Sequence, residues 1–151
     1  MLRILLFVIF VSATQAAFSQ SAEDSIKAAV NQLFAAMKDS DANKLRSTFS
    51  STAVLQTVNV DRTGAVTIGN ETVDEFADIV AKTPAGMLDE RIRFEKIYID
   101  GPLATVWTPY NFYYNGKFSH CGVNSFQLVR IGNEWKIQYI IDTRRVAGCA
   151  E

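Results

Sequence analysis

Residues 103–145 read LATVWTPYNFYYNGKFSHCGVNSFQLVRIGNEWKIQYIIDTRR and contain the two turns that decide the fold. Asn115-Gly116 separates two runs rich in β-branched and aromatic residues, and Asn-Gly is the strongest short-range signal for a two-residue hairpin turn. Gly132-Asn133 separates the second run from a third in the same way. The sequence therefore predicts three long antiparallel strands, which cover residues 103–114, 117–130 and 134–145.

An unbroken ladder with two-residue turns also predicts which side chains share a face of this sheet. Side chains alternate along a strand, and directly paired residues point the same way. One face is then apolar at one end and polar at the other, which describes a hydrophobic cup with a polar lip. The aromatic residues on this face suit a ring-bearing ligand, although an ordinary core would also use them. The expected ligand-binding residues are Trp107, Asn111, Tyr113, His120, Asn124, Tyr139 and Arg145.

Two residues are candidates for catalysis if the protein is an enzyme. His120 is the only histidine, and imidazole titrates near neutral pH, although a lone histidine is more often structural. Strict pairing points Asp142 outward in an ion pair with Arg144, but a bulge near Ile140-Ile141 would aim it into the cup as a general base. At the lip, Arg145 is either a group that holds a carboxylate or phosphate, or a solvated terminal arginine.

The two cysteines, Cys121 and Cys149, suggest a crosslink rather than a metal site. Disulfides persist in oxidising compartments, and Gly148 would let the chain turn back, so we expect one intramolecular bridge. Two free thiols, or a bridge between chains, are the alternatives. Adjacent strand residues point to opposite faces, so His120 and Cys121 cannot converge on a metal or form a dyad. We expect no metal and no cofactor.

The start of the chain has the organisation of a signal peptide over residues 1–19. A short basic start precedes the apolar run Ile4–Val11, and Ala17-Phe18-Ser19 fits a cleavage site before Gln20. A single-pass anchor is the alternative, but its span needs about 20 apolar residues. We therefore expect an exported protein, periplasmic or secreted, with one domain over residues 20–151 and no membrane anchor after cleavage.

The charge balance of the chain limits the classes of partner that we expect. The chain carries 15 Lys and Arg against 16 Asp and Glu, and no charge run exceeds Arg144-Arg145. Nucleic acid is therefore not an expected partner. No internal repeat or Pro/Gly-rich linker divides the chain, which is long enough for one core and too short for two.

Upstream of the long strands, the sequence predicts a helix, a second short helix, a hairpin and a third helix. Ser21–Asp24 resembles a capping box before an apolar helical face that begins at Ile26. Asp41 is the expected start of the second helix, and Thr72–Glu75 is a capping box for the third. The hairpin turns at residues 61–64.

The next segment, residues 91–100, reads as a strand whose alternation slips. A bulge at Glu95-Lys96 would restore a common apolar face, and Pro109 interrupts the following strand. Two such defects indicate strong curvature. The sequence thus predicts an α+β domain whose helices fill the concave side of a bent sheet.

This order of elements resembles the nuclear-transport-factor-2-like superfamily. Residues 119–126 (SHCGVNSF), 134–137 (EWKI) and 141–145 (IDTRR) look like its exported bacterial lumazine-binding-like and SnoaL-like branch. The resemblance implies a cone-shaped α+β barrel with a mainly antiparallel sheet, often dimeric through the outer sheet face. Members include steroid isomerases, polyketide cyclases, dehydratases and epoxide hydrolases. The isomerases' catalytic aspartate and tyrosine-based oxyanion hole do not map onto this chain, so the resemblance implies a pocket and leaves its chemistry open.

Three functions fit this pattern. They are a protein that binds a small apolar or aromatic molecule, an acid–base enzyme of the isomerase, cyclase or dehydratase type, and a dimeric interaction module. Binding comes first, because the predicted cup holds an imidazole only at its lip and no carboxylate inside. Asp142 turned inward beside His120 would put the enzyme first. We also expect a homodimer through an outer face that mixes apolar and polar residues, namely Val106, Thr108, Tyr110, Val123, Ser125, Val129 and Ile140.

Overall fold

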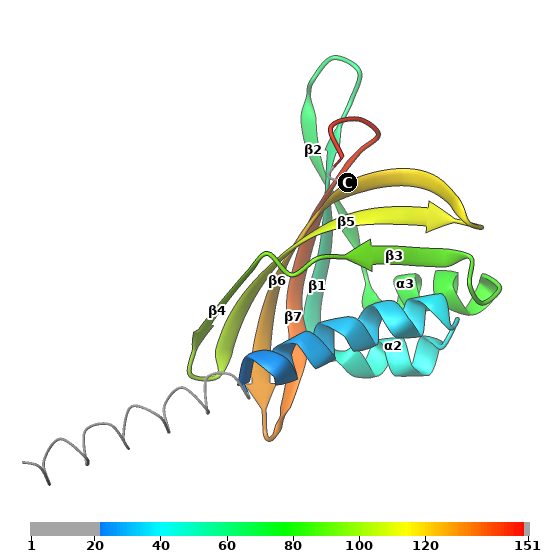
Figure 1. Ribbon diagram of the computed structural model, residues 1–151. Helices are drawn as coiled ribbons and strands as arrows, with labels where there is room; N and C mark the ends of the chain where they lie inside the picture. Colours follow the sequence, from blue (N-terminus) through cyan, green and yellow to red (C-terminus); the bar gives the residue numbers. More distant parts are fainter. Residues whose placement is uncertain (1–21, 150–151) are drawn as a thin grey trace, which may run out of the picture.

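The computed structural model describes residues 22–149. The predicted signal peptide, residues 1–19, and Ser21 of the first predicted capping box lie outside the described residues. Three helices lie on the concave side of one strongly curved sheet (Figure 1). The helices cover residues 22–38, α2 (Ala42–Thr48) and α3 (Val73–Lys82). The strands are β1 (Phe49–Val60), β2 (Val66–Glu71), β3 (Leu88–Ile92), β4 (Lys96–Asp100), β5 (Leu103–Tyr114), β6 (Lys117–Ile131) and β7 (Glu134–Arg145).

Side-chain caps fix where two of the helices begin. The Asp41 carboxylate accepts from the backbone N–H of Lys44 at 2.9 Å, as expected of an N-cap residue. Thr72 and Glu75 form a complete capping box, in which each side chain accepts from the other residue's backbone N–H. Both predicted starts are confirmed. Within the described residues, no helix is long and apolar enough to cross a membrane.

The sheet runs in the order β2-β1-β7-β6-β5-β3, and β4 also pairs with β5. All of these pairings are antiparallel except that of β1 with β7, which brings the first and last strands together in parallel. The predicted strand over residues 91–100 is divided into β3 and β4, and the predicted bulge at Glu95-Lys96 is confirmed, because Glu95 bonds to Trp107 and Lys96 pairs with the same residue. Backbone bonds from Arg93 to Pro109 and from Glu95 to Trp107 continue along the same edge of β5, so the two pieces bend around it.

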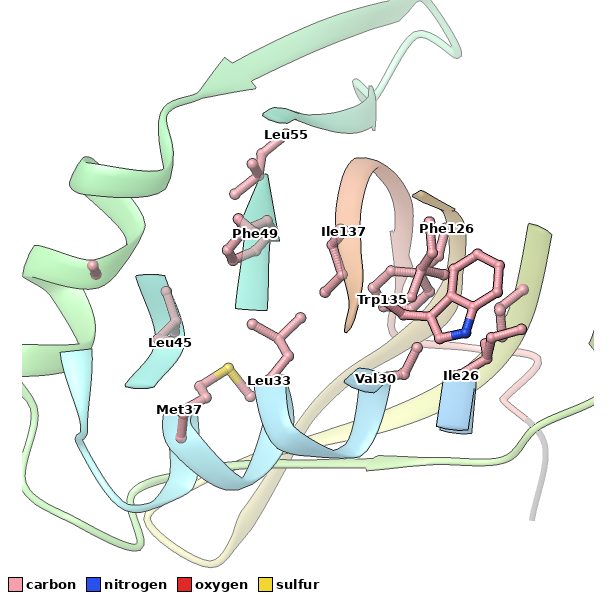
Figure 2. Close-up of a cluster of buried hydrophobic side chains, with 14 of the residues drawn as sticks. Ile26, Val30, Leu33, Met37, Leu45, Phe49, Leu55, Phe126, Trp135 and Ile137 are labelled. Atoms are coloured by element: carbon pink, nitrogen blue, oxygen red, sulfur yellow. The ribbon is translucent and has the colours of Figure 1, made fainter. Parts of the chain in front are cut away.

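The core lies between the N-terminal helix and the concave face of the sheet (Figure 2). Ile26, Val30 and Leu33 project from the helix toward Phe126 and Ile137 on the strands. All five side chains are buried. Burying an aliphatic or aromatic side chain contributes roughly 1.5–3 kcal/mol, so this layer holds the helix against the sheet.

Two bulges change the register that an unbroken ladder predicts. In β5–β6, Tyr113 pairs with Phe118 but Phe112 pairs with His120, so Ser119 is an extra residue. In β6–β7, Gln138 is extra in the same way. One extra residue reverses the parity of everything beyond it.

The predicted pocket face is therefore partly wrong. Five side chains that were predicted to face the cavity lie on the outer face of the sheet: Trp107, Asn111, Tyr113, Tyr139 and Arg145. The outer face predicted for dimerisation is corrected by the same shift. Five side chains that were predicted to face outward lie on the inner face of the sheet: Val106, Thr108, Tyr110, Ile140 and Asp142.

Candidate functional site

A cavity of about 250 Å³ opens between the helices and the concave face of the sheet. Most of its wall is apolar, built by the N-terminal helix, α3 and the inner strand faces. Its polar groups lie together on β1, β2, β3, β5, β6 and β7. They are Gln56, Thr57, Glu71, Glu90, Tyr110, His120, Asn124, Asp142 and Arg144.

Two carboxyl groups of this cavity have few donors: Glu71 accepts no hydrogen bond from the described residues, and Glu90 accepts one. Glu90 pairs with Phe112 across β3–β5, which points both side chains inward. The Asn124 amide donates to its Oε1 at 2.8 Å, and its Oε2 accepts no hydrogen bond from the described residues. Burial, and to a smaller degree the nearby Asp142 carboxylate, raise the pKa of Glu90 to about 7. This carboxyl group can thus accept and release a proton near neutral pH.

Asp142, by contrast, is fully occupied by donors. Thr57 Oγ1 donates to its Oδ1 at 2.5 Å, and Arg144 Nε donates to its Oδ2 at 2.8 Å. The Tyr110 hydroxyl lies 3.2 Å from the same Oδ2 and 3.0 Å from the Thr143 carbonyl oxygen. A carboxylate held by Thr57 and Arg144, with the Tyr110 proton shared between it and the Thr143 carbonyl oxygen, is a fixed anion that orients its neighbours. The outward orientation predicted by strict pairing is therefore wrong, because the bulge at Gln138 turns Asp142 inward, and the predicted ion pair with Arg144 forms on the inner side.

Tyr110 is held in place by close packing. Its side chain is 5% exposed, and burial is the main cause that raises the pKa of its hydroxyl. The ring passes over Gly122, its partner in the β5–β6 ladder. Because glycine has no Cβ, the Tyr110 hydroxyl can reach β7.

His120 lines the cavity, as the sequence predicts, and lies among aromatic rings. Its ring centroid is 5.0 Å from that of Phe112 and 5.8 Å from that of Tyr110. Burial lowers the pKa of the imidazole, and the nearby Arg144 guanidinium lowers it further. The imidazole is therefore neutral at physiological pH and can both donate and accept a hydrogen bond.

Of the seven predicted ligand-binding residues, the structure brings only His120 and Asn124 to the cavity. The other five lie on the outer face, where Trp107 is 44% exposed beside Tyr98, because the bulges reverse their parity. Sequence reasoning missed Glu90 because the predicted strand began one residue later, at Arg91. It missed Tyr110 and Phe112 because the extra residue at Ser119 shifts the β5–β6 pairing by one and turns these two side chains inward.

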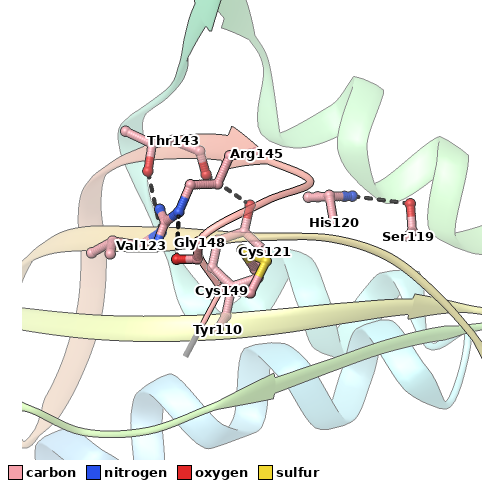
Figure 3. Close-up of a disulfide and its surroundings, with 9 residues drawn as sticks. All are labelled: Tyr110, Ser119, His120, Cys121, Val123, Thr143, Arg145, Gly148 and Cys149. Carbon is pink, nitrogen blue, oxygen red and sulfur yellow. Dashed lines mark hydrogen bonds between the residues drawn. A yellow bond between two sulfur atoms is a disulfide. The ribbon is translucent and has the colours of Figure 1, made fainter. Parts of the chain in front are cut away.

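The C-terminal residues fold back over β6 and are tied there by a disulfide between Cys121 and Cys149 (Figure 3). The two Cα atoms are 5.7 Å apart. Gly148 takes a positive φ of 65°, which lets the chain reverse after β7. The bridge thus fixes the end of the chain on the outer side of the strands that carry Tyr110 and His120.

Comparisons with known proteins identify relatives of this chain. A family model described as "Putative lumazine-binding" matches residues 21–139. No curated protein matches the sequence.

Solved structures with a similar fold include three bacterial nuclear-transport-factor-2-like proteins. One, of unknown function, from Shewanella baltica is 16% identical with a TM-score of 0.65, over 84% of this chain and 96% of that one. Another, also of unknown function, from Silicibacter pomeroyi is 14% identical with a TM-score of 0.66, over 84% and 98%. A "putative dehydratase" from Streptomyces avermitilis is 16% identical with a TM-score of 0.64, over 85% and 99%. At these identities the likeness concerns the fold alone.

Proposed function

The chain belongs to the family described as "Putative lumazine-binding", within the nuclear-transport-factor-2-like superfamily, and we propose that it is an acid–base enzyme acting on a small ring-bearing molecule. In this proposal Glu90 moves the proton, and Arg144 and His120 supply hydrogen bonds to the polar edge of the substrate. One observation carries it. Glu90 lies in an apolar cavity with a single donor, at a pKa of about 7.

The cavity supports a substrate of one or two rings. Its volume of about 250 Å³ is just below that of pockets for drug-sized ligands, which span roughly 300–1,000 Å³. Phe34, Phe76 and Phe112 offer flat apolar surfaces to a ring, and the polar groups gather on the strand side. A small planar molecule with carbonyl or N–H groups along one edge would satisfy both parts.

The division of labour among the acidic groups supports Glu90 over Asp142 as the base. A base needs an oxygen that is free to receive the substrate proton. The donors around Asp142 compete with the substrate for its carboxylate oxygens. Asp142 instead holds Arg144, whose side chain is 55% exposed and whose remaining N–H groups can donate into the cavity. A guanidinium held in this way can stabilise negative charge that develops on a substrate oxygen.

In the proposed reaction, the ionised Glu90 takes a proton from a carbon next to a carbonyl group. The electron pair of the C–H bond forms the C=C bond of an enolate, and the π pair of the carbonyl group moves to its oxygen, which accepts hydrogen bonds from Arg144 and His120. Return of the proton from Glu90 to another carbon of a conjugated enolate gives an isomer, and transfer of that proton to a departing β-hydroxyl releases water and gives a dehydrated product. Both outcomes begin with the same proton transfer.

Hydrogen–deuterium exchange tests this first step without knowledge of the final product. The mature protein is incubated in D₂O with a panel of cyclic ketones, enones and bicyclic heteroaromatic compounds, and loss of the C–H signal is followed by NMR. We expect at least one compound to exchange. Glu90→Gln should slow this exchange by about a hundredfold to ten-thousandfold, the usual contribution of a general base.

Glu95→Gln is the matched control, since Glu95 is exposed on the outer face and lies away from the cavity. It should exchange at the wild-type rate. Wild-type exchange that survives Glu90→Gln, while the variant still binds the compound, would assign the base to another residue.

A carrier is the second candidate, and the family description favours it. A carrier would retain its ligand and leave it unchanged. Native mass spectrometry of protein purified from its own host distinguishes the two functions. A retained ring-bearing molecule that shows no exchange in D₂O would favour the carrier.

A further inference from the structure

A second hollow lies on the outer side of the sheet and carries the opposite charge to the cavity. It has a volume of about 120 Å³. Three arginines, Arg91, Arg93 and Arg145, line it together with Asn111, and no carboxylate does so among the described residues. Three guanidinium groups therefore gather on a chain whose formal net charge is −1.

The sheet register explains why these residues meet. Arg91 pairs with Asn111, Asn111 with Cys121, and Cys121 with Arg145, which gives one row across β3, β5, β6 and β7. Three strand spacings separate the two arginine backbones, or about 14 Å. Residues of one row project from the same face, so the side chains of Arg91 and Arg145 both lie on the outer side of the sheet and line the same hollow. Arg93 is in the adjoining row and adds a third cation.

Two of the arginines are held in position. Arg91 donates from Nε and Nη2 to Asp89 Oδ2 at 3.0 and 2.9 Å, and its guanidinium lies 4.1 Å from the Tyr113 ring centroid. Arg145 donates from Nε to the Gly148 carbonyl oxygen at 3.3 Å (Figure 3). The disulfide at Cys149 fixes the segment that carries this carbonyl.

Positive charge nevertheless remains in excess. Asp89 shares its carboxylate between Arg91 and Lys38 and so balances less than one of the three guanidinium groups. Arg93 and Arg145 have no carboxylate partner among residues 22–149. Arginines that line one hollow, with an amide beside them, offer the donors that carboxylate and phosphate oxygens accept.

We propose that this arginine hollow, formed by Arg91, Arg93, Asn111 and Arg145, binds an oxyanion, either a phosphate group or the carboxylate of a small molecule. The hollow is distinct from the cavity, because its arginines lie on the opposite side of the sheet. Tyr110 lines both. An anion bound there would also offset repulsion among the three cations.

Titration of the mature protein with inorganic phosphate, followed by ¹H–¹⁵N NMR at constant ionic strength, tests the site. We expect saturable shifts of the Arg93 and Arg145 side-chain Nε–H signals and of the Asn111 and Gly122 backbone amides. Arg93→Ala and Arg145→Ala should each weaken phosphate binding about tenfold to a hundredfold, as expected for the loss of a charge-assisted contact. Acetate, titrated in the same way, shows whether a carboxylate binds more tightly than phosphate.

Arg62→Ala is the matched control, since Arg62 is an exposed arginine in the turn between β1 and β2. It should bind both anions with wild-type affinity. Unchanged α3 signals in each variant would establish that the fold is intact. Shifts that rise linearly without saturation for both anions, or that Arg62→Ala weakens as much as Arg93→Ala, would overturn the proposal.

Discussion

Gly122 and Tyr110 are direct partners in the β5–β6 ladder, and no Cβ atom fits between them. A Cβ at position 122 would lie 1.7 Å from the Thr143 carbonyl oxygen and 2.8 Å from Cε1 of Tyr110. Both groups belong to residues that are joined by the hydrogen bond from the Tyr110 hydroxyl to the Thr143 carbonyl oxygen. The missing side chain at Gly122 is therefore what allows β5 and β7 to approach each other over β6.

Gly122→Ala is accordingly expected to lower the free energy of unfolding by about 3 kcal/mol, because backbone and an aromatic ring must both move. Urea denaturation measures this. Gly69→Ala is the matched control within a strand, since its Cβ would meet the end of the flexible Asn59 side chain at 3.0 Å and the Thr57 carbonyl oxygen at an ordinary contact distance of 3.8 Å. Equal losses in the two variants would mean that the contact at Gly122 is relieved easily.

The pKa of Glu90 gives stability a specific dependence on pH. Its pKa rises from 4.5 to about 7 on folding, so between these values the folded protein keeps a proton that the unfolded chain has lost. Stability from this group is therefore highest below pH 4.5 and falls by up to about 3 kcal/mol as the pH rises to 7.

Glu90→Gln should remove this part of the pH dependence and be the more stable protein above neutral pH. Urea denaturation at about pH 5 and about pH 8 compares it with wild type and with Glu95→Gln. An identical loss in all three proteins would place the Glu90 carboxyl in a solvated environment.

The sequence could predict the features of this structure that depend on neighbouring residues, and it could not predict those that depend on the packing of distant ones. Caps such as Thr72–Glu75 are local, and the prediction was correct. The alternation was also correct along β6 beyond Ser119, which is why His120 and Asn124 both lie in the cavity. The register between strands was wrong beyond Ser119 and Gln138, because a bulge depends on curvature and core packing, and neither leaves a local signal.

The corrected register changes which residues should contact a ligand. Phe112→Ala and Asn124→Ala should weaken ligand binding by about tenfold or more, since both side chains line the cavity. Trp107→Ala should leave binding unchanged, although an unbroken ladder would place Trp107 inside. Isothermal titration with a compound that shows proton exchange measures all three. Stronger loss in Trp107→Ala would require the register to be revised.

We expect a homodimer through the outer sheet face, where exposed Tyr98, Leu103 and Trp107 accompany Val123. Symmetric pairing is the commonest form of oligomer, and clustered aromatic groups are typical of interfaces. Val123→Glu should yield monomers with unchanged circular dichroism, whereas Val66→Glu, on the exposed β2 hairpin, should stay dimeric. Light scattering that reports a monomer for the wild type at micromolar concentration would contradict this expectation.

Export is a separate prediction, and it rests on residues 1–19 alone. Intact-mass analysis of material from the periplasm or medium should show a protein that begins at or near Gln20. Recovery of the full-length chain in detergent extracts would support the membrane-anchor alternative.

The extra residues at Ser119 and Gln138 separate the chemistry of the cavity from the shape of the sheet. Removal of either residue could leave every ladder pair in place, so a shorter homologue could keep the same inner lining on a flatter sheet. An ungapped alignment across either position would instead match inner residues of one protein with outer residues of the other. The curvature of this sheet depends on how many residues lie between ladder pairs, whereas the chemistry of the cavity depends on which residues form those pairs. Evolution can therefore change the curvature by insertion or deletion and the cavity by substitution.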